Sequence, residues 1–232
     1  MCGRFVQATP VAELARMFGV PELPNLEPNW NVAPTQDVSV IGRGEDGGRH
    51  LRTMRWGLVP FWAKDIGIGS KMINARADGI AEKPAFREAF KRKRLLIPAD
   101  GFYEWQAAEG GKKQPLYFKP ADGRPLVFAG LWESWKGPKE APLDKALFTT
   151  TIITTDANAF MRPIHDRMPM ILEEGDWDTW LDPEADRDTL LSLLKPARDG
   201  GLVAVPVSTR VNSVRNKGPD LVEPVGAAGT LI

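Results

Sequence analysis

Apolar positions along the chain fall mostly into short runs rich in β-branched and aromatic residues, a pattern typical of strands. These runs predict strands at 37–41, 51–59, 95–97, 101–105, 116–118, 126–132, 146–155, 168–172 and 202–207. Apolar positions at helical spacing predict helices at 10–18, 84–93, 157–161, 177–181 and 187–194. Turn-forming residues predict a hairpin tip at 42–48 and a turn at 98–101. The proline-rich stretch 21–36 and the chain from 215 onward predict irregular structure.

Many strands with only a few helices, and no linker that divides the chain, indicate the α+β class. We expect a single domain over residues 1–232, built on a curved, barrel-like and mostly antiparallel sheet with a few flanking helices. The C-terminal residues of this domain are expected to be irregular.

Composition narrows the function classes. With 43% hydrophobic and 26% charged residues, the chain is typical of a globular protein. A net charge of zero gives no overall attraction for nucleic acid, so any polyanion site has to be local. The basic run 91–94 is one candidate, although such runs are more often solvated helix faces. We expect no membrane span, no leader segment and a cytoplasmic protein, and with one cysteine and two histidines we expect no metal site and no cofactor.

The only cysteine is the second residue, in the segment Met1-Cys2-Gly3-Arg4. A lone cysteine is most often a small buried hydrophobe. If Met1 is removed, however, the α-amine and the thiol of Cys2 form an aminothiol, which condenses with an aldehyde to an imine and then closes to a thiazolidine ring. The reference pKa values, about 7.7–8.0 for the amine and about 8.5 for the thiol, bring both groups within reach of a nucleophilic form.

Three further segments carry more polar groups than core strands need. Asn74 and Arg76 flank an alanine and face the same side of an extended segment, either as a site pair or as a plain surface pair. Glu104 lies between Tyr103 and Trp105, where it either faces water or enters an aromatic pocket as a proton shuttle. His165 precedes an aspartate and an arginine at the edge of a predicted strand, in a structural or a catalytic position.

Together these segments resemble the SRAP (SOS response-associated peptidase) family of abasic-site processing proteins. The matching pieces occur in the expected order, at 1–4 (MCGR), 56–62 (WGLVPFW), 74–77 (NARA), 96–105 (LIPADGFYEW), 154–158 (TTDAN) and 165–169 (HDRMP). A later pair of pieces, at 207–208 and 211–212, also fits the C-terminal segment of the family. One departure is Asp78, where the family usually has a glutamate.

The resemblance implies a DNA-damage protein that binds single-stranded DNA and forms a thiazolidine crosslink with abasic sites through Cys2. It implies that Asn74 positions the amine or the opened sugar, that Glu104 moves protons and that His165 assists at the sugar oxygen. Arg4, Arg76 and Arg167 would hold phosphates, and Trp105 and Trp62 would stack on exposed bases. It also implies self-removal of Met1 and an abasic-site lyase side reaction.

Two other classes of function remain open at this stage. One is a thiol peptidase acting in trans, with Cys2 as nucleophile and His165 as base. The other is a non-catalytic module that binds single-stranded DNA through the same arginines and tryptophans. In each case we expect a monomer that is associated with the nucleoid when it is bound to DNA.

Overall fold

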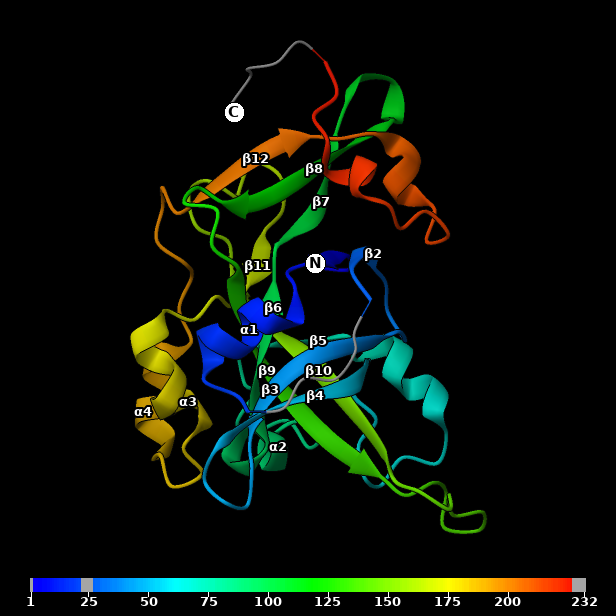
Figure 1. The fold of residues 1–232 in the computed structure, drawn as a ribbon. Coiled ribbons are helices and arrows are strands. Elements are labelled where there is room, and N and C mark those ends of the chain that lie inside the picture. Colours follow the sequence, from blue (N-terminus) through cyan, green and yellow to red (C-terminus); the bar gives the residue numbers. More distant parts are fainter. Residues whose placement is uncertain (1, 22–26, 227–232) are drawn as a thin grey trace.

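The computed structural model describes residues 2–21 and 27–226. Its upper part is a five-stranded sheet of order β12-β8-β7-β1-β2 (Figure 1). The bounds of these strands, in the same order, are Leu202–Pro206, Lys113–Pro120, Gly101–Ala107, Phe5–Gln7 and Asn29–Val32. All neighbouring strands of this sheet are antiparallel.

Below this sheet, five strands of a second, seven-stranded sheet close into a barrel. The order is β11-β10-β4-β3-β6-β9, and β9 pairs again with β10. The bounds, in that order, are Arg167–Pro169, Leu147–Asp156, Arg49–Trp56, Asp37–Arg43, Arg94–Ala99 and Leu126–Trp135. The short strand β5 (Asn74–Arg76) pairs with the last part of β10. The pairs β10–β4 and β10–β5 are parallel, and the other pairs of this sheet are antiparallel.

The strands of the barrel bury side chains on both of their faces. One core takes residues from every barrel strand, among them Val40, Trp56, Ile97, Phe128 and Ile152, and it continues into Phe5 and Phe102 of the upper sheet. The other core takes the opposite faces, with Leu96, Ala129 and Ile153, and packs against the helices. The upper sheet therefore covers one end of the barrel, and the helices cover part of its outside.

The helices are short and lie mainly on one flank of the barrel (Figure 1). Their bounds are Val11–Phe18 (α1), Arg87–Arg92 (α2), Trp177–Leu181 (α3) and Arg187–Leu193 (α4). The 3-10 helices are Ile66–Lys71 (η1), Glu109–Gly111 (η2), Glu174–Asp176 (η3), Thr209–Asn212 (η4) and Pro219–Val222 (η5). No helix in the described ranges combines the length and the apolar character needed to cross a membrane.

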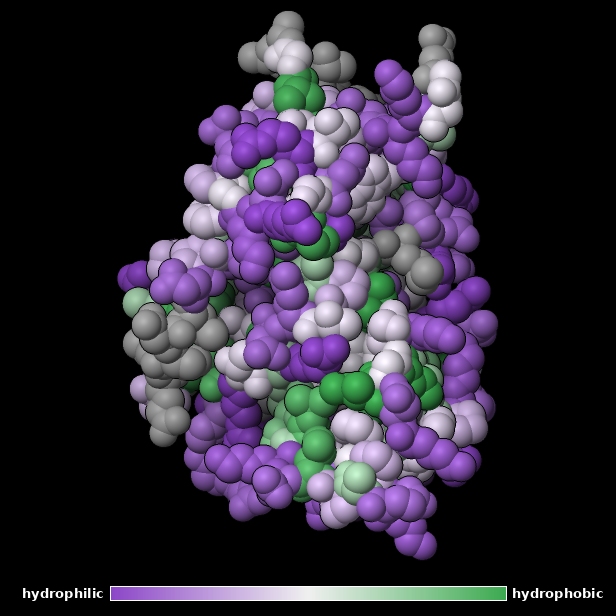
Figure 2. Space-filling model, turned by 90° about the vertical axis from the view of Figure 1, so that its right-hand side faces the viewer, coloured by the Kyte–Doolittle hydropathy of each residue, from purple (hydrophilic) through white to green (hydrophobic). Residues whose placement is uncertain are grey.

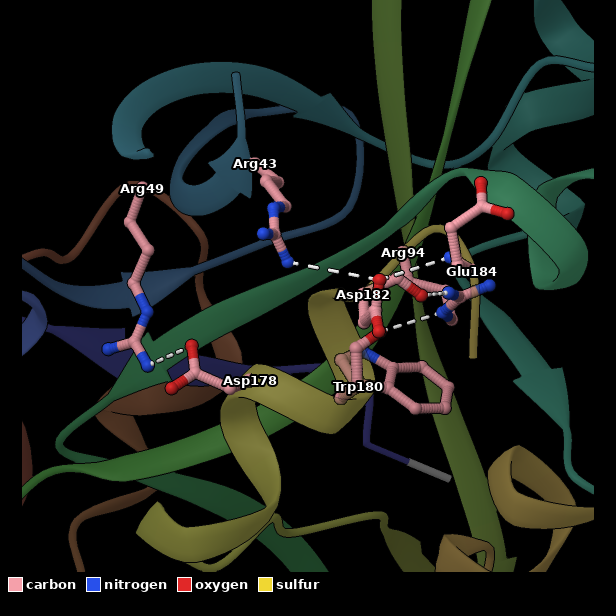
Figure 3. A network of polar contacts seen from close by, with 7 residues as sticks. All are labelled: Arg43, Arg49, Arg94, Asp178, Trp180, Asp182 and Glu184. Atoms are coloured by element: carbon pink, nitrogen blue, oxygen red, sulfur yellow. Dashed lines mark hydrogen bonds and ion pairs between the residues drawn. The ribbon is translucent and has the colours of Figure 1, made fainter. Parts of the chain in front are cut away.

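Arg94 joins two of these helices to the barrel (Figure 3). Its guanidinium donates to the carbonyl oxygens of Phe90 and Lys91 at the end of α2, and to those of Trp180 and Asp182 at the end of α3. Burial lowers the pKa of Arg94 to about 10, so the group remains charged at neutral pH. Lys93 pairs with the buried Glu133. The basic run 91–94 therefore leaves only its first two residues exposed, and it is not a four-charge surface for a polyanion.

The expected α+β class, with a curved, barrel-like and mostly antiparallel sheet, is confirmed. The single domain over 1–232 stays a prediction. The stretch 21–36 contains a strand, β2, because pairing with β1 outweighs its proline content. Residues 57–59 leave the strand because Gly57 has a φ of 123°. Residues 157–161 form turns and not a helix, since the ladder between β10 and β11 fixes both ends of a short connection.

Two further expectations differ at turns and ends. The turn predicted at 98–101 is confined to Asp100, because β6 continues to Ala99 and β7 starts at Gly101. Part of the C-terminal stretch is ordered, as η5 and a bridge between Val207 and Pro224. Predictions that fall on residues 1, 22–26 and 227–232 lie outside the described residues.

Candidate functional site

Cys2 lies between the covered end of the barrel and the upper sheet, immediately before β1. It is fully buried and belongs to the core that both sheets share. The side-chain amide Nδ2 of Asn74 donates a hydrogen bond of 2.9 Å to the carbonyl oxygen of Cys2. The Cys2 thiol donates a long contact of 4.0 Å to the carbonyl oxygen of Arg4. The backbone next to the predicted reactive atoms is therefore held by a side chain from the other sheet.

Glu104 faces the same core from β7. The strand alternation places it on the same face as Phe102, and only 4% of its surface is exposed. Burial raises the pKa of the Cys2 thiol far above its ordinary value, and the negative charge of Glu104 raises it further. The thiol is therefore protonated at neutral pH. A preformed thiolate, the usual nucleophile of a thiol peptidase, is therefore disfavoured at Cys2.

β5 and β11 place three of the predicted residues beside the end of β10. Ile152 pairs with Asn74 and Thr154 pairs with Arg76, while Asp156 pairs with Arg167 on β11. Paired residues project to the same face of a sheet. Asn74, Arg76 and Arg167 thus project from strands on either side of β10 toward the face that carries Ile152, which packs in the Cys2 core.

This face also carries a residue that the sequence reasoning did not select. Thr154 is 1% exposed, and its hydroxyl has no hydrogen-bond partner in the described part of the chain. The same is true of the buried Oδ1 of Asn74. Buried polar atoms without partners are uncommon and often mark binding sites. In the sequence, Thr154 is one of several threonines in β10, and the preference of threonine for strands is enough to account for such a run.

His165 is half-buried just before β11. The backbone N–H of Arg167 donates to its Nδ1 at 3.0 Å, and Oδ1 of Asp166 lies 2.8 Å from the same nitrogen. The Arg167 side chain is 16% exposed, with its Nε 4.0 Å from Asp166 Oδ1. The His165 imidazole and the Arg167 guanidinium thus both lie next to Asp166, near the end of β10.

Arg4 is engaged within the protein. Its Nη1 donates to Oδ1 of Asn31 at 2.7 Å and to the carbonyl oxygen of Val211 at 2.8 Å. Burial lowers the pKa of Arg4, although not enough to neutralise a guanidinium at neutral pH. Asn31 is fully buried on β2, and its Nδ2 donates to the carbonyl oxygens of Ser213 and Asn216. Arg4 and Asn31 therefore fasten the C-terminal segment over β1, a contact that the sequence analysis missed.

The two predicted stacking tryptophans differ in their surroundings. Trp105 is half-buried at the end of β7, and its Nε1 donates to Oδ1 of Asn212 at 2.8 Å. Trp62 is 49% exposed on the loop after β4 and follows Phe61, which is 59% exposed; Ile66, at the start of η1, is 40% exposed. Figure 2 shows hydrophobic side chains gathered on the lower part of the face of the molecule that the figure draws. Trp135 holds this loop by donating to the carbonyl oxygen of Ala63.

The structure thus brings Cys2, Asn74 and Glu104 into one buried cluster, with His165, Arg76 and Arg167 on the strands and loops around the end of β10. Trp62 lies on a separate loop. Asp78 is exposed, and its carbonyl oxygen, not its carboxylate, accepts a bond from Lys83. In residues 2–21 and 27–226, no group of three His, Cys, Asp or Glu side chains is arranged to hold a metal ion.

Cys2 is buried, with the Asn74 amide bonded to its carbonyl oxygen and the Glu104 carboxylate close enough to act on its thiol. The family model described as SOS response associated peptidase (SRAP) matches residues 1–214. The chain belongs to this family.

Relatives of known name agree with this assignment. The chain is 44% identical over 228 residues to the abasic site processing protein YoqW of Bacillus subtilis, covering 96% of this chain and 99% of the relative. It is 38% identical to the abasic site processing protein HMCES of Gallus gallus, covering 85% of this chain and 66% of that protein. A crystal structure of a protein from Bacteroides thetaiotaomicron superposes with a TM-score of 0.85 at 27% identity, covering 97% of this chain and 100% of the other.

Proposed function

We propose that this protein captures abasic sites in single-stranded DNA as a covalent thiazolidine, formed by the α-amine and thiol of Cys2 once Met1 has been removed. The observation that carries the proposal is the burial of the second residue beside Asn74 and Glu104, one group that holds its backbone and one that can exchange protons. The names of the curated relatives support the choice of an abasic site as substrate.

The chemistry needs no oxidant or cofactor. An abasic deoxyribose opens to an aldehyde at C1. The Cys2 amine adds to this carbon, and loss of water leaves an imine. The S–H bond then adds across the C=N bond: the sulfur bonds to C1 and the proton passes to the nitrogen. The product is a five-membered ring, and the net change is the loss of one water.

The raised pKa of Cys2 suits this sequence of steps. A thiol that stays protonated reacts only when a base beside it accepts the proton as the carbon–sulfur bond forms. Glu104, whose charge contributes to the raised pKa, is that base in our proposal. The open Oδ1 of Asn74 is an acceptor for the new α-ammonium or for a sugar hydroxyl.

The DNA strand would be held by local contacts, because the chain carries no net charge. Arg76 is exposed, and it flanks the buried hydroxyl of Thr154, so that both offer donors to a phosphate. Arg167 approaches from the opposite side of β10. The exposed ring of Trp62 and the open part of Trp105 offer faces for unpaired bases, a form of binding that does not depend on sequence.

The same imine allows a lyase side reaction. An imine at C1 acidifies the protons at C2, and removal of one by a base expels the 3′ phosphate with cleavage of the C3–O bond. The Cys2 site would also remove its own Met1 by hydrolysis of the first peptide bond. Crosslinking, which shields the lesion, is the main activity in our proposal, and its biological setting is the DNA-damage response.

The test combines intact-mass analysis with an abasic oligonucleotide. We expect the purified protein to lack the mass of Met1, and to gain the mass of the oligonucleotide minus one water. Cys2→Ala should form no adduct, and Asn74→Ala and Glu104→Gln should form it more slowly. An oligonucleotide with a reduced abasic site, which has no aldehyde, is the matched control. Reversible binding without any adduct would favour a simple binding module, and cleavage of unrelated peptides would favour a peptidase.

A further inference from the structure

One nitrogen of His165 has two partners that cannot be satisfied together. The backbone N–H of Arg167 points at Nδ1 from 3.0 Å and needs a lone pair there. The carboxylate oxygen Oδ1 of Asp166 lies 2.8 Å from the same Nδ1 and can accept a proton that this nitrogen carries. An imidazole nitrogen is either a donor or an acceptor at any moment. The position of the ring proton therefore decides which partner is bound.

The two arrangements leave the other ring nitrogen in different states. When Arg167 donates to Nδ1, a neutral ring carries its proton on Nε2 and can only donate there. When Asp166 accepts from Nδ1, Nε2 has a lone pair in the neutral ring and a proton in the cationic ring. The Arg167 N–H is fixed by the β10–β11 ladder, whereas the Asp166 side chain is 83% exposed and able to turn.

We propose that Asp166 is a positioning residue that releases His165 from the tautomer imposed by the Arg167 backbone, so that Nε2 can both give and take a proton. The proposal rests on the proposed function in its use of His165 at the abasic sugar. The charged groups at Nδ1 are the Asp166 carboxylate and, 4.0 Å from that carboxylate, Nε of Arg167. The Arg167 guanidinium partly offsets the negative charge of the Asp166 carboxylate, and the carboxylate remains the acceptor for a proton on Nδ1.

The proton balance shows why both states are needed. Cationic His165 gives its Nε2 proton to the ring oxygen of the sugar as the C1–O bond breaks, while Glu104 accepts the proton of the C1 hydroxyl, which becomes the aldehyde oxygen. The neutral ring that remains has its proton on Nδ1, held by Asp166. When the amine adds to the aldehyde, Nε2 takes a proton from the Cys2 nitrogen and Glu104 returns its proton to the C1 oxygen, which gives the carbinolamine. Nε2 then protonates the departing hydroxyl, which leaves as water, and takes the second proton from the Cys2 nitrogen as the neutral imine forms. His165 is then cationic again, and Glu104 is a carboxylate again. A ring locked with its proton on Nε2 can donate a hydrogen bond but cannot complete this cycle.

The chain contains two histidines, so the ring nitrogens are easily assigned by ¹⁵N NMR, with His50→Gln to remove the other signal. His50 also serves as a reference, because its Nε2 faces the Asp46 carboxylate at 2.9 Å. Without DNA, we expect neutral His165 in the native protein to populate the tautomer protonated at Nδ1. In Asp166→Ala it should convert almost entirely to the tautomer protonated at Nε2. Asp166→Glu should restore the native pattern.

The functional arm measures adduct formation with the abasic oligonucleotide. Asp166→Ala should slow it by at least about tenfold, the lower range for losing an acid–base step, with an unchanged thermal midpoint. Asp178→Ala, which alters an equally exposed carboxylate at 84%, is the control and should leave the rate unchanged.

Unchanged ring nitrogen signals in Asp166→Ala would overturn the proposal whatever the rate, and so would an unchanged rate whatever the signals. If the native protein forms no adduct at all, the proposed function fails, while the NMR result still decides the tautomer.

Discussion

The surroundings of Cys2 lower the reactivity of its thiol by keeping it protonated. Burial and the charge of Glu104 both raise its pKa, so they act in the same direction and keep the proton on the sulfur. A general alkylating reagent therefore meets a largely unreactive thiol. In the proposed mechanism, the aldehyde would meet the amine first, and the thiol would react only after the imine has formed.

This restraint predicts slow alkylation of Cys2. In the folded protein at pH 8, iodoacetamide should modify Cys2 far more slowly than it modifies the unfolded chain, because the thiolate fraction is small and access is limited. Glu104→Gln removes the second cause of the raised pKa, so it should speed alkylation several-fold, by about the same factor at pH 7 and at pH 9 because both values lie far below the pKa of the buried thiol. Glu184→Gln, outside the site, is the control. Mass spectrometry follows the reaction, and equal rates in all three proteins would contradict the electrostatic account.

Thr35 has a strained backbone in the turn between β2 and β3. Its φ of 71° is the only positive φ of a non-glycine residue in the described chain. Its N–H donates to the carbonyl oxygen of Trp56 at 2.8 Å, and its own carbonyl oxygen accepts from Arg55. These bonds hold the left-handed conformation, which is unfavourable for a β-branched residue.

Relief of this strain should stabilise the protein. Thr35→Gly should raise the free energy of unfolding by about 1 kcal/mol, since the left-handed conformation costs roughly 1–2 kcal/mol and the added freedom of glycine offsets part of the gain. Thr35→Asn should give a smaller gain in the same direction, while Thr35→Ala should not gain because alanine has the same restriction. Urea unfolding followed by tryptophan fluorescence measures the change. A loss of stability in the glycine variant would show that the threonine side chain is needed.

At the scale of elements, two glycines bring the loop after β4 back to the sheet. The carbonyl oxygen of Gly69, in η1, lies 2.6 Å from where a Cβ on Gly57 would be, and the carbonyl oxygen of Gly57 lies equally close to a Cβ on Gly69. Gly57 also has a φ of 123° and donates to the carbonyl oxygen of Thr150. This contact sets where the chain enters β5, and with it the position of Asn74.

Three alanine substitutions separate conformational strain from crowding. Gly47→Ala introduces strain alone, because its φ is 78° and nothing lies near its missing Cβ. Gly69→Ala introduces crowding alone, and Gly57→Ala introduces both. We expect Gly57→Ala to cost about 2–4 kcal/mol, roughly the sum of a strained backbone and an overpacked contact. It should also slow adduct formation by displacing Asn74. Equal losses for Gly57→Ala and Gly47→Ala would mean that the loop moves away without cost.

The elements that the sequence predicted correctly are those with a strong local pattern. The apolar, β-branched run of β10 and the helical spacing of α1 identify themselves from their own residues. β2 did not, because its place depends on pairing with β1, and a proline-rich stretch has no local signal for that. The helix predicted at 157–161 is wrong for the same reason, since the β10–β11 ladder that determines the turns there is a tertiary constraint.

In the candidate site, too, the features with a local sequence pattern were predictable and those that depend on distant partners were not. The alternation of Asn74 and Arg76 placed both on one side of an extended segment, as the register of β5 confirms. Glu104 proved to face the core and not water, which its neighbours in the sequence left open. Asn31 and Thr154 went unnoticed because their importance comes from partners far along the chain, such as the C-terminal carbonyls that Asn31 holds. Such contacts exist only in three dimensions.

At the scale of the whole molecule, the barrel and the sheet above it bury several acidic protons. Burial raises the pKa values of the phenols of Tyr103 and Tyr117 well above their ordinary value, as it does that of Cys2. Arg94 and Arg4 shift the other way, because burial disfavours their charged forms. The buried acids and the buried arginines therefore change the free energy of unfolding in opposite directions as the pH rises. The larger number of protons decides whether stability falls or rises.

Stability should fall in alkali. Near pH 10.5 the unfolded chain loses protons from Cys2, Tyr103 and Tyr117 that the native state keeps, so native stability falls as pH rises above the unfolded values. Arg94, with a pKa of about 10, loses a proton that the unfolded chain keeps, which acts in the opposite direction. Three protons kept and one lost by Arg94 leave a net of about two, or a slope of roughly 2.7 kcal/mol per pH unit once these four groups have titrated. The smaller lowering of the Arg4 pKa acts in the same direction as Arg94 and makes the fall somewhat shallower. Urea unfolding at pH 8.0, 9.5 and 10.5 should show this fall, and Tyr117→Phe should make it shallower by removing one of the kept protons. A free energy of unfolding that stays level or rises over this range would mean that the guanidinium of Arg94, and not the thiol and phenols of the core, governs the response of the fold to alkali.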